Sequence, residues 1–188
     1  MFDTLKVYTP SNEQEKTDLK AMLDFIDHYD NVLLRDNLIA HFTASAIVLN
    51  QHMDHILFAY HKIYDSWGWV GGHNDGDPDF LKVAIKEAME ETGIKDVYPF
   101  SEDILGIDII EVPNHIKRGK YVGDHLHLNL TYLLIADDTQ EIMHKPDENL
   151  DVKWFNLKTY ESFVSENRMK PVYSKLIQKA LKLKEKAL

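Results

Sequence analysis

Three glutamates near the middle of the chain have the spacing for metal chemistry. Glu87, Glu90 and Glu91 stand at positions i, i+3 and i+4, so a helix would gather their side chains on one face. Like charges repel there, and the last turn of a helix disfavours anions. A hard divalent cation would offset this repulsion, because magnesium and manganese prefer carboxylate oxygens. The alternative is a solvated acidic face with Lys82 and Lys86 as partial partners.

The elements that must position these glutamates can be inferred from their neighbours. Asp77 as the N-cap and Pro78 as the first helical residue predict a helix that begins at Pro78. Gly93 predicts a left-handed end to that helix, and Gly71-Gly72 form a glycine turn before it. Apolar residues recur between these limits at the spacing of a buried stripe, namely Leu81, Ala84, Ile85, Ala88 and Met89.

This stretch resembles the Nudix box. The box reads Gly, five residues, Glu, seven residues, Arg-Glu, an apolar residue, any residue, Glu-Glu, any residue, Gly and an apolar residue. Gly72 takes the place of the first glycine, and Glu87 follows the basic position. Glu90 and Glu91 form the pair, and Gly93-Ile94 closes the box.

Two positions depart from the pattern. Lys86 replaces the arginine, which keeps the charge but loses the planar fork that can hold a carboxylate bidentately. Pro78 replaces the first glutamate, although Asp77 and Asp79 flank it and could supply a carboxylate. Neither departure removes one of the three glutamates.

The resemblance covers roughly residues 38–165 and implies an α/β fold, with an α/β/α sandwich around a mixed sheet. It implies a hydrolase that uses Mg²⁺, or Mn²⁺ in its place, to cleave a diphosphate linkage in a nucleoside-diphosphate-type small molecule. Glu87, Glu90 and Glu91 would be the catalytic residues and metal ligands, with the backbone carbonyl of Gly71 as a further ligand. The general base stays open between Glu87 and a carboxylate outside the box such as Glu111.

Two other activities compete with hydrolysis. One is a catalytically silent Nudix module that binds or senses a nucleotide, and the intact glutamate trio argues against it. The other is an isomerase acting on a prenyl diphosphate, which the absence of cysteine disfavours because the Nudix-like prenyl isomerases use a catalytic cysteine. The box handles only diphosphate and metal, so it does not identify the substrate.

Length and charge narrow the class of protein. A chain of 188 residues with 44% hydrophobic residues fits a single domain spanning residues 1–188. A formal net charge of -10 disfavours a polynucleotide partner, because phosphate-backbone binding needs clustered Lys and Arg. No long apolar run or signal peptide is visible, so we expect a cytoplasmic protein without a membrane partner.

Segments outside the box predict a sheet with helical additions. Residues 11–35 predict a helical extension that begins with a Ser11–Gln14 capping box and either covers the core or helps to form a homodimer. Residues 171–187 predict an amphipathic C-terminal helix. Strands are expected at residues 41–50, 54–60, 103–112, 124–136 and 150–157.

The strand at residues 124–136 has a polar face that includes His125 and His127. A His-x-His strand can bind a transition metal, as in a cupin, but no carboxylate and distal histidine follow at cupin-like spacing. We therefore assign this face to the substrate cleft, with hydrogen-bonded structural histidines as the alternative.

The loop between two of these strands, PNHIKRGKYVG, carries the basic residues Lys117, Arg118 and Lys120. Such a cluster is typical of a solvated hairpin tip. In an acidic chain it could also clamp a substrate phosphate, and we include Arg118 and Lys120 among the substrate-binding candidates.

Overall fold

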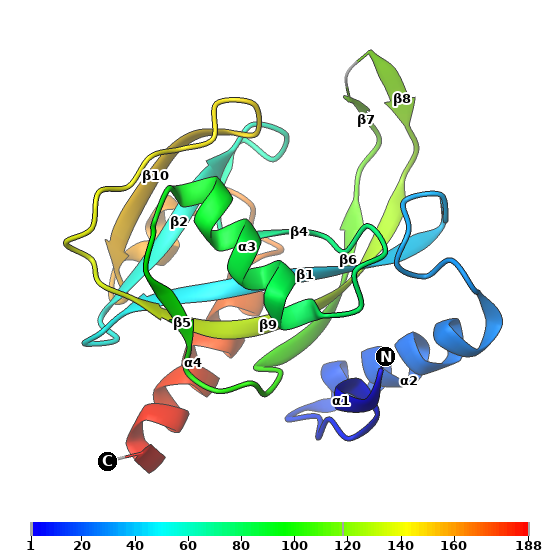
Figure 1. Cartoon of the computed structure of the whole chain (residues 1–188), viewed down its shortest axis with the longest axis horizontal. Helices are drawn as coiled ribbons and strands as arrows, with labels where there is room; N and C mark the ends of the chain where they lie inside the picture. Colours follow the sequence, from blue (N-terminus) through cyan, green and yellow to red (C-terminus); the bar gives the residue numbers. More distant parts are fainter. Residues whose placement is uncertain (1, 118, 188) are drawn as a thin grey trace.

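The computed structural model describes residues 2–117 and 119–187. An eight-stranded mixed sheet lies between helices, which confirms the predicted α/β/α sandwich (Figure 1). Its centre is β1 (Ala40–Asn50), which pairs in parallel with β9 (His125–Ala136) over its whole length.

The remaining strands of this sheet pair antiparallel with their neighbours. The path through the sheet is β10-β2-β1-β9-β5, and three further strands pair with β2, β1 and β9. The three further strands are β3 (Ser66–Gly68) on β2, β4 (Val70–His73) on β1 and β6 (Gly106–Val112) on β9. The other strands of the path are β2 (His55–His61), β5 (Val97–Pro99) and β10 (Asn149–Asn156).

Alternation along β1 divides the core into two layers. Phe42 and Ala44 face α3 (Phe80–Thr92), whereas Ile47 and Leu49 pack with α4 (Lys170–Ala187) on the opposite face. Figure 1 shows α3 in front of the sheet and α4 behind it. None of the described helices is long and apolar enough to cross a membrane.

Within the extension predicted to be helical at residues 11–35, the structure has one helix, α2 (Glu13–His28), followed by turns up to β1. A short helix that was not predicted, α1 (Asp3–Lys6), precedes it. The predicted cap at Ser11 is wrong. Asn12 is the N-cap, because its side-chain oxygen accepts the backbone N–H of Glu15 at 2.8 Å, while the Ser11 hydroxyl donates to the Glu15 carboxylate.

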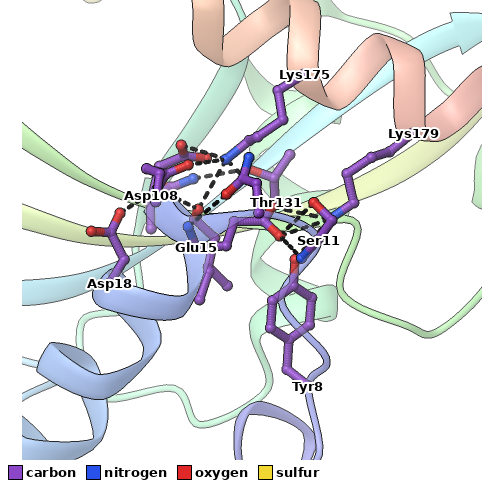
Figure 2. A network of polar contacts seen from close by, with 12 residues as sticks. Tyr8, Ser11, Glu15, Asp18, Asp108, Thr131, Lys175 and Lys179 are labelled. Carbon is purple, nitrogen blue, oxygen red and sulfur yellow. Dashed lines mark hydrogen bonds and ion pairs between the residues drawn. The ribbon is translucent and has the colours of Figure 1, made fainter.

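Buried ion pairs join α2 to α4 and β6 (Figure 2). The fully buried Glu15 accepts from Lys179 at 3.0 Å, and Lys175 lies 2.7 Å from Asp108. Burial alone would raise the pKa of Glu15, but hydrogen bonds from Ser11, Tyr8 and Lys179 outweigh it and lower that pKa to about 2. Glu15 is therefore a carboxylate at neutral pH.

The basic loop forms a separate hairpin, β7 (His115–Lys117) and β8 (Lys120–Val122), which projects from the body of the molecule (Figure 1). After β10 the chain forms a short 3₁₀ helix, Tyr160–Phe163.

Candidate active site

The helix that carries the three glutamates begins later than its sequence predicts. Asp79 is the N-cap and accepts the backbone N–H of Lys82 at 3.0 Å, so α3 begins at Phe80 rather than at Pro78. Asp77 instead accepts the Asp79 N–H and pairs with the Lys82 ammonium. Gly93 ends the helix in the left-handed conformation, with φ of 72°, as predicted.

Strand β4 approaches α3 so closely that it requires glycine. A Cβ atom built on Gly72 would lie 2.5 Å from the carboxyl carbon of Glu87. The next glycine toward the N-terminus, Gly71, donates its backbone N–H to the Glu91 carboxylate at 2.8 Å. The glycine pair therefore brings two of the three glutamates against the sheet.

Glu91 is the most deeply buried of the three, with 2% of its surface exposed. Its second carboxylate oxygen accepts from the side-chain amide of Asn149 on β10 at 2.8 Å. Burial raises the pKa of Glu91 to about 7, although both hydrogen bonds oppose that rise.

Glu87 and Glu90 lie nearer to solvent and share two lysines. Lys86 lies 3.7 Å from Glu87 and 3.6 Å from Glu90, and Lys145 lies 3.5 Å from Glu90. Burial, followed by the charge of Glu91, raises the pKa of Glu87. The protein surroundings therefore leave negative charge at this site incompletely compensated, which favours the binding of a cation.

The remaining predicted site residues lie away from these contacts. His125 and His127 lie on the opposite face of the sheet. His73, which was not predicted, joins them there, because it follows Gly72 on β4 and its side chain therefore leaves the other face. Glu111 on β6 forms an ion pair with Arg168 at 3.5 Å. Lys120 is exposed on β8, and Arg118 lies outside the described residues.

Sequence reasoning missed two residues that meet here, Asn149 and Lys145. Asn149 carried no recognisable signal, because it lies 58 positions from Glu91. Lys145 carried none either, because it lies 55 positions from Glu90.

A comparison with protein families matches the NUDIX domain over residues 40–179. The chain belongs to the Nudix family. Nudix hydrolases act on pyrophosphate bonds in small phosphorylated substrates and generally use divalent metals. This confirms the family inferred from the box and the class of pyrophosphohydrolase.

Individual relatives are distant from this Nudix chain. An RNA pyrophosphohydrolase from Pelagibacter ubique is 28% identical over 130 residues, which cover 65% of this chain and 80% of that protein. The structure of a Caenorhabditis elegans Ap4A hydrolase binary complex superposes with a TM-score of 0.54 and 17% identity, covering 76% of this chain and 96% of that one. The Mycobacterium smegmatis Nudix hydrolase RenU has a TM-score of 0.52 and 11% identity, with coverages of 78% and 86%. These two structures support the fold.

Proposed function

We propose that this Nudix protein is a Mg²⁺-dependent hydrolase that cleaves the diphosphate linkage of a nucleoside-diphosphate-type small molecule. The observation that carries the proposal is the convergence of Glu87 and Glu91 on the Gly71-Gly72 segment, with Glu90 beside them. Glu91 is buried, and the donors to its two oxygens among the described residues are both neutral, Gly71 N–H and the Asn149 amide.

The residues fit a hard divalent cation. Glu87, Glu90 and Glu91 would hold it through carboxylate oxygens, and the carbonyl of Gly71 would add a backbone ligand. When bound, the metal neutralises charge developing on phosphate and lowers the pKa of a water ligand. The chain itself orients Glu91 through Gly71 and Asn149, and it restricts Glu87 through the close approach of β4.

The substrate class is inferred from the net charge of the chain and from the names of its relatives. The net charge of -10 disfavours long polynucleotides, so a small anhydride is the better substrate. The names of the relatives point to Ap4A and to RNA as substrates to test. A hydrolysis screen with Mg²⁺ should therefore include both, together with nucleotide sugars, ADP-ribose and oxidised nucleoside triphosphates.

Glu91→Gln tests the assignment on the best substrate of that screen. We expect kcat to fall by about a hundredfold or more, because one charged metal ligand is removed while size is kept. Glu148→Gln is the matched control, since Glu148 is an exposed neighbour that pairs with Lys145 at 3.3 Å. Parental turnover by the Glu91 variant would show that the Glu91 charge is not needed to hold a catalytic metal, and no turnover by the parent on any substrate would favour the silent nucleotide-binding module.

A further inference from the structure

A second cluster of ligand-type side chains lies on the face of β4 opposite the glutamates. It consists of His41 on β1, His73 on β4, and His125 and His127 on β9. One ring nitrogen from each of these four residues lies within 4.8 Å of the other three. The three strands are neighbours in the sheet, and His41 is in register with His127. The cluster is therefore built on rigid elements.

Two of these histidines have their tautomers set by backbone carbonyls. The Nδ1 atom of His41 lies 3.1 Å from the Asn37 carbonyl, and Nδ1 of His125 lies 2.9 Å from the Gly123 carbonyl. A carbonyl only accepts, so each Nδ1 carries the proton and each Nε2 presents a lone pair. Histidines that bind metals are usually oriented by a hydrogen bond of this kind.

The lone pair of His41 is left without a hydrogen bond. His41 is 4% exposed, and its Nε2 atom is buried with no partner among the described residues. Leaving a buried acceptor unsatisfied costs about 1–3 kcal/mol. Its environment does not favour a proton there, because burial lowers the pKa of His41.

His127 is held in its neutral form as well. Burial, followed by the charge of the neighbouring His73, lowers the pKa of His127 to about 2. Neutral imidazoles attract anions poorly but coordinate transition metals well. Neutral His41 and His127 therefore suit a transition metal better than an anionic substrate, whereas the sequence assigned the face that carries His125 and His127 to the substrate cleft.

The spacing of the nitrogens fits a tetrahedral ion. Zinc–nitrogen bonds of 2.0–2.1 Å place two ligand atoms of a tetrahedron about 3.4 Å apart. The Nε2 atoms of His125 and His127 are 3.3 Å apart, with the N–H of His127 donating to the lone pair of His125, so an ion held by both atoms replaces this shared proton. The widest pair is separated by no more than 4.8 Å, so closure requires movements of about 1 Å, within reach of side-chain rotation.

We propose that His41, His73, His125 and His127 form a four-coordinate site for zinc or a similar divalent transition metal. The site is distinct from the Mg²⁺ site: one uses imidazole nitrogen and the other carboxylate oxygen, a difference that separates the two classes of metal. By linking β4 to β1 and β9, a bound ion would stabilise the strand that carries Gly71 and Gly72.

Co²⁺ is the probe of choice, because its visible spectrum distinguishes tetrahedral from octahedral coordination. The full chain is titrated with Co²⁺ in excess Mg²⁺, which occupies carboxylate sites. We expect one Co²⁺ per chain with tetrahedral absorption, displacement by Zn²⁺, and a rise in melting temperature. The half-buried His73 and His127 are replaced singly by glutamine, and each change should weaken Co²⁺ binding by about 100-fold, the upper end of the losses typical of changes around a bound metal.

Two control variants show whether Co²⁺ binds at the four histidines or elsewhere on the chain. His52→Gln removes an exposed histidine outside the cluster, and Glu90→Gln removes a carboxylate of the Mg²⁺ site; both should bind Co²⁺ like the parent. Far-UV circular dichroism checks folding of each variant. Unaltered Co²⁺ affinity in a folded His127→Gln variant would overturn the proposal, and so would a parent that shows only octahedral absorption or no binding. If both cluster variants fail to fold, the parent spectrum still tests the coordination: tetrahedral absorption in excess Mg²⁺ supports a histidine site, and octahedral absorption or no binding overturns it.

Discussion

Gly72 determines where Glu87 can lie, because a methyl group at this position would occupy the space of the carboxylate. The distance of 2.5 Å from an ideal Cβ to the carboxyl carbon is too short for any real contact. We expect Gly72→Ala to displace Glu87 and lower kcat at least tenfold, the loss that corresponds to about 1.4 kcal/mol of transition-state stabilisation.

Gly123→Ala is the matched control for this change. A Cβ at Gly123 meets nothing within 4 Å, and this glycine is not among those with positive φ. Steady-state kinetics and thermal unfolding of both variants check the prediction. Equal activity in the Gly72 variant and the control would mean that Glu87 tolerates displacement and contributes little to turnover.

Replacing Glu91 should affect activity and stability differently. Burial disfavours its charged form, and a glutamine can keep the hydrogen bond from Gly71 through its oxygen. Asn149 now turns its Nδ2 toward Glu91, so a half-turn of the Asn149 amide is needed for the glutamine NH2 to donate to the Asn149 oxygen. In a chelator at pH 8 we expect Glu91→Gln to unfold at the same denaturant concentration as the parent or slightly higher, with a gain of about 1 kcal/mol at most. Marked destabilisation would show that the carboxylate is needed for folding as well as for metal.

At the residue scale, the predictable part of the site was the part encoded by local spacing. The three glutamates and the glycines lie in one short stretch, and helix periodicity alone places the glutamates together. Asn149 and the four-histidine cluster are brought together by strand pairing, which a local pattern does not contain. His125 and His127 were visible as a pair, but their partners on β1 and β4 were not.

At the scale of elements, Glu15 fastens α2 to α4. Its carboxylate is fully buried and lies 3.0 Å from Lys179 and 3.4 Å from Lys175. Removing one partner of a buried ion pair leaves an uncompensated charge, so Glu15→Gln should lower the free energy of unfolding by roughly 3 kcal/mol. Denaturant unfolding at neutral pH measures this loss.

The loss should depend on pH with a definite sign. The folded pKa of Glu15, about 2, lies below its ordinary value of 4.5, so its contribution is fully present above pH 4.5 and is lost as pH falls toward 2. The parent and the glutamine variant should therefore converge in stability across that window. Glu13→Gln, an exposed neighbour on α2, is the control and should differ little from the parent. A pH-independent gap would indicate that packing rather than charge is responsible.

The β7–β8 hairpin is the element whose role the sequence left most open. Metal accounts for the diphosphate alone, and Arg118 could grip a further substrate phosphate bidentately. Arg118→Ala should then raise KM roughly tenfold with little change in kcat, whereas Lys20→Ala on α2 should change neither. An unchanged KM in the Arg118 variant would make the hairpin an ordinary solvated projection.

Element boundaries were predicted less well than the elements themselves. Aspartates and serines near a helix start compete as caps, and tertiary contacts decide among them. Asp77 was available as a cap for α3 but is engaged by Asp79 and Lys82, and Ser11 is engaged by Glu15. Their neighbours Asp79 and Asn12 cap the helices instead.

For the molecule as a whole, the box was sufficient to predict the fold through resemblance, but the order of strands was not readable from alternation. β1 and β9 are buried along most of their length, so both strands have few exposed positions that would orient them. Their parallel pairing has to come from the crossover of the intervening chain, including α3.

This parallel pairing also affects the order in which the protein can fold during its synthesis. The residues of β1 can pair with β9 only after residues 126–136 have been synthesised, and Glu91 can bind Asn149 only later still. During synthesis from the N-terminus, the glutamate helix can form early, yet the sheet beneath it stays open until most of the chain has been made. A nascent chain that stops before β10 contains the whole segment from Gly72 to Ile94 but lacks the Asn149 amide that holds Glu91 in place.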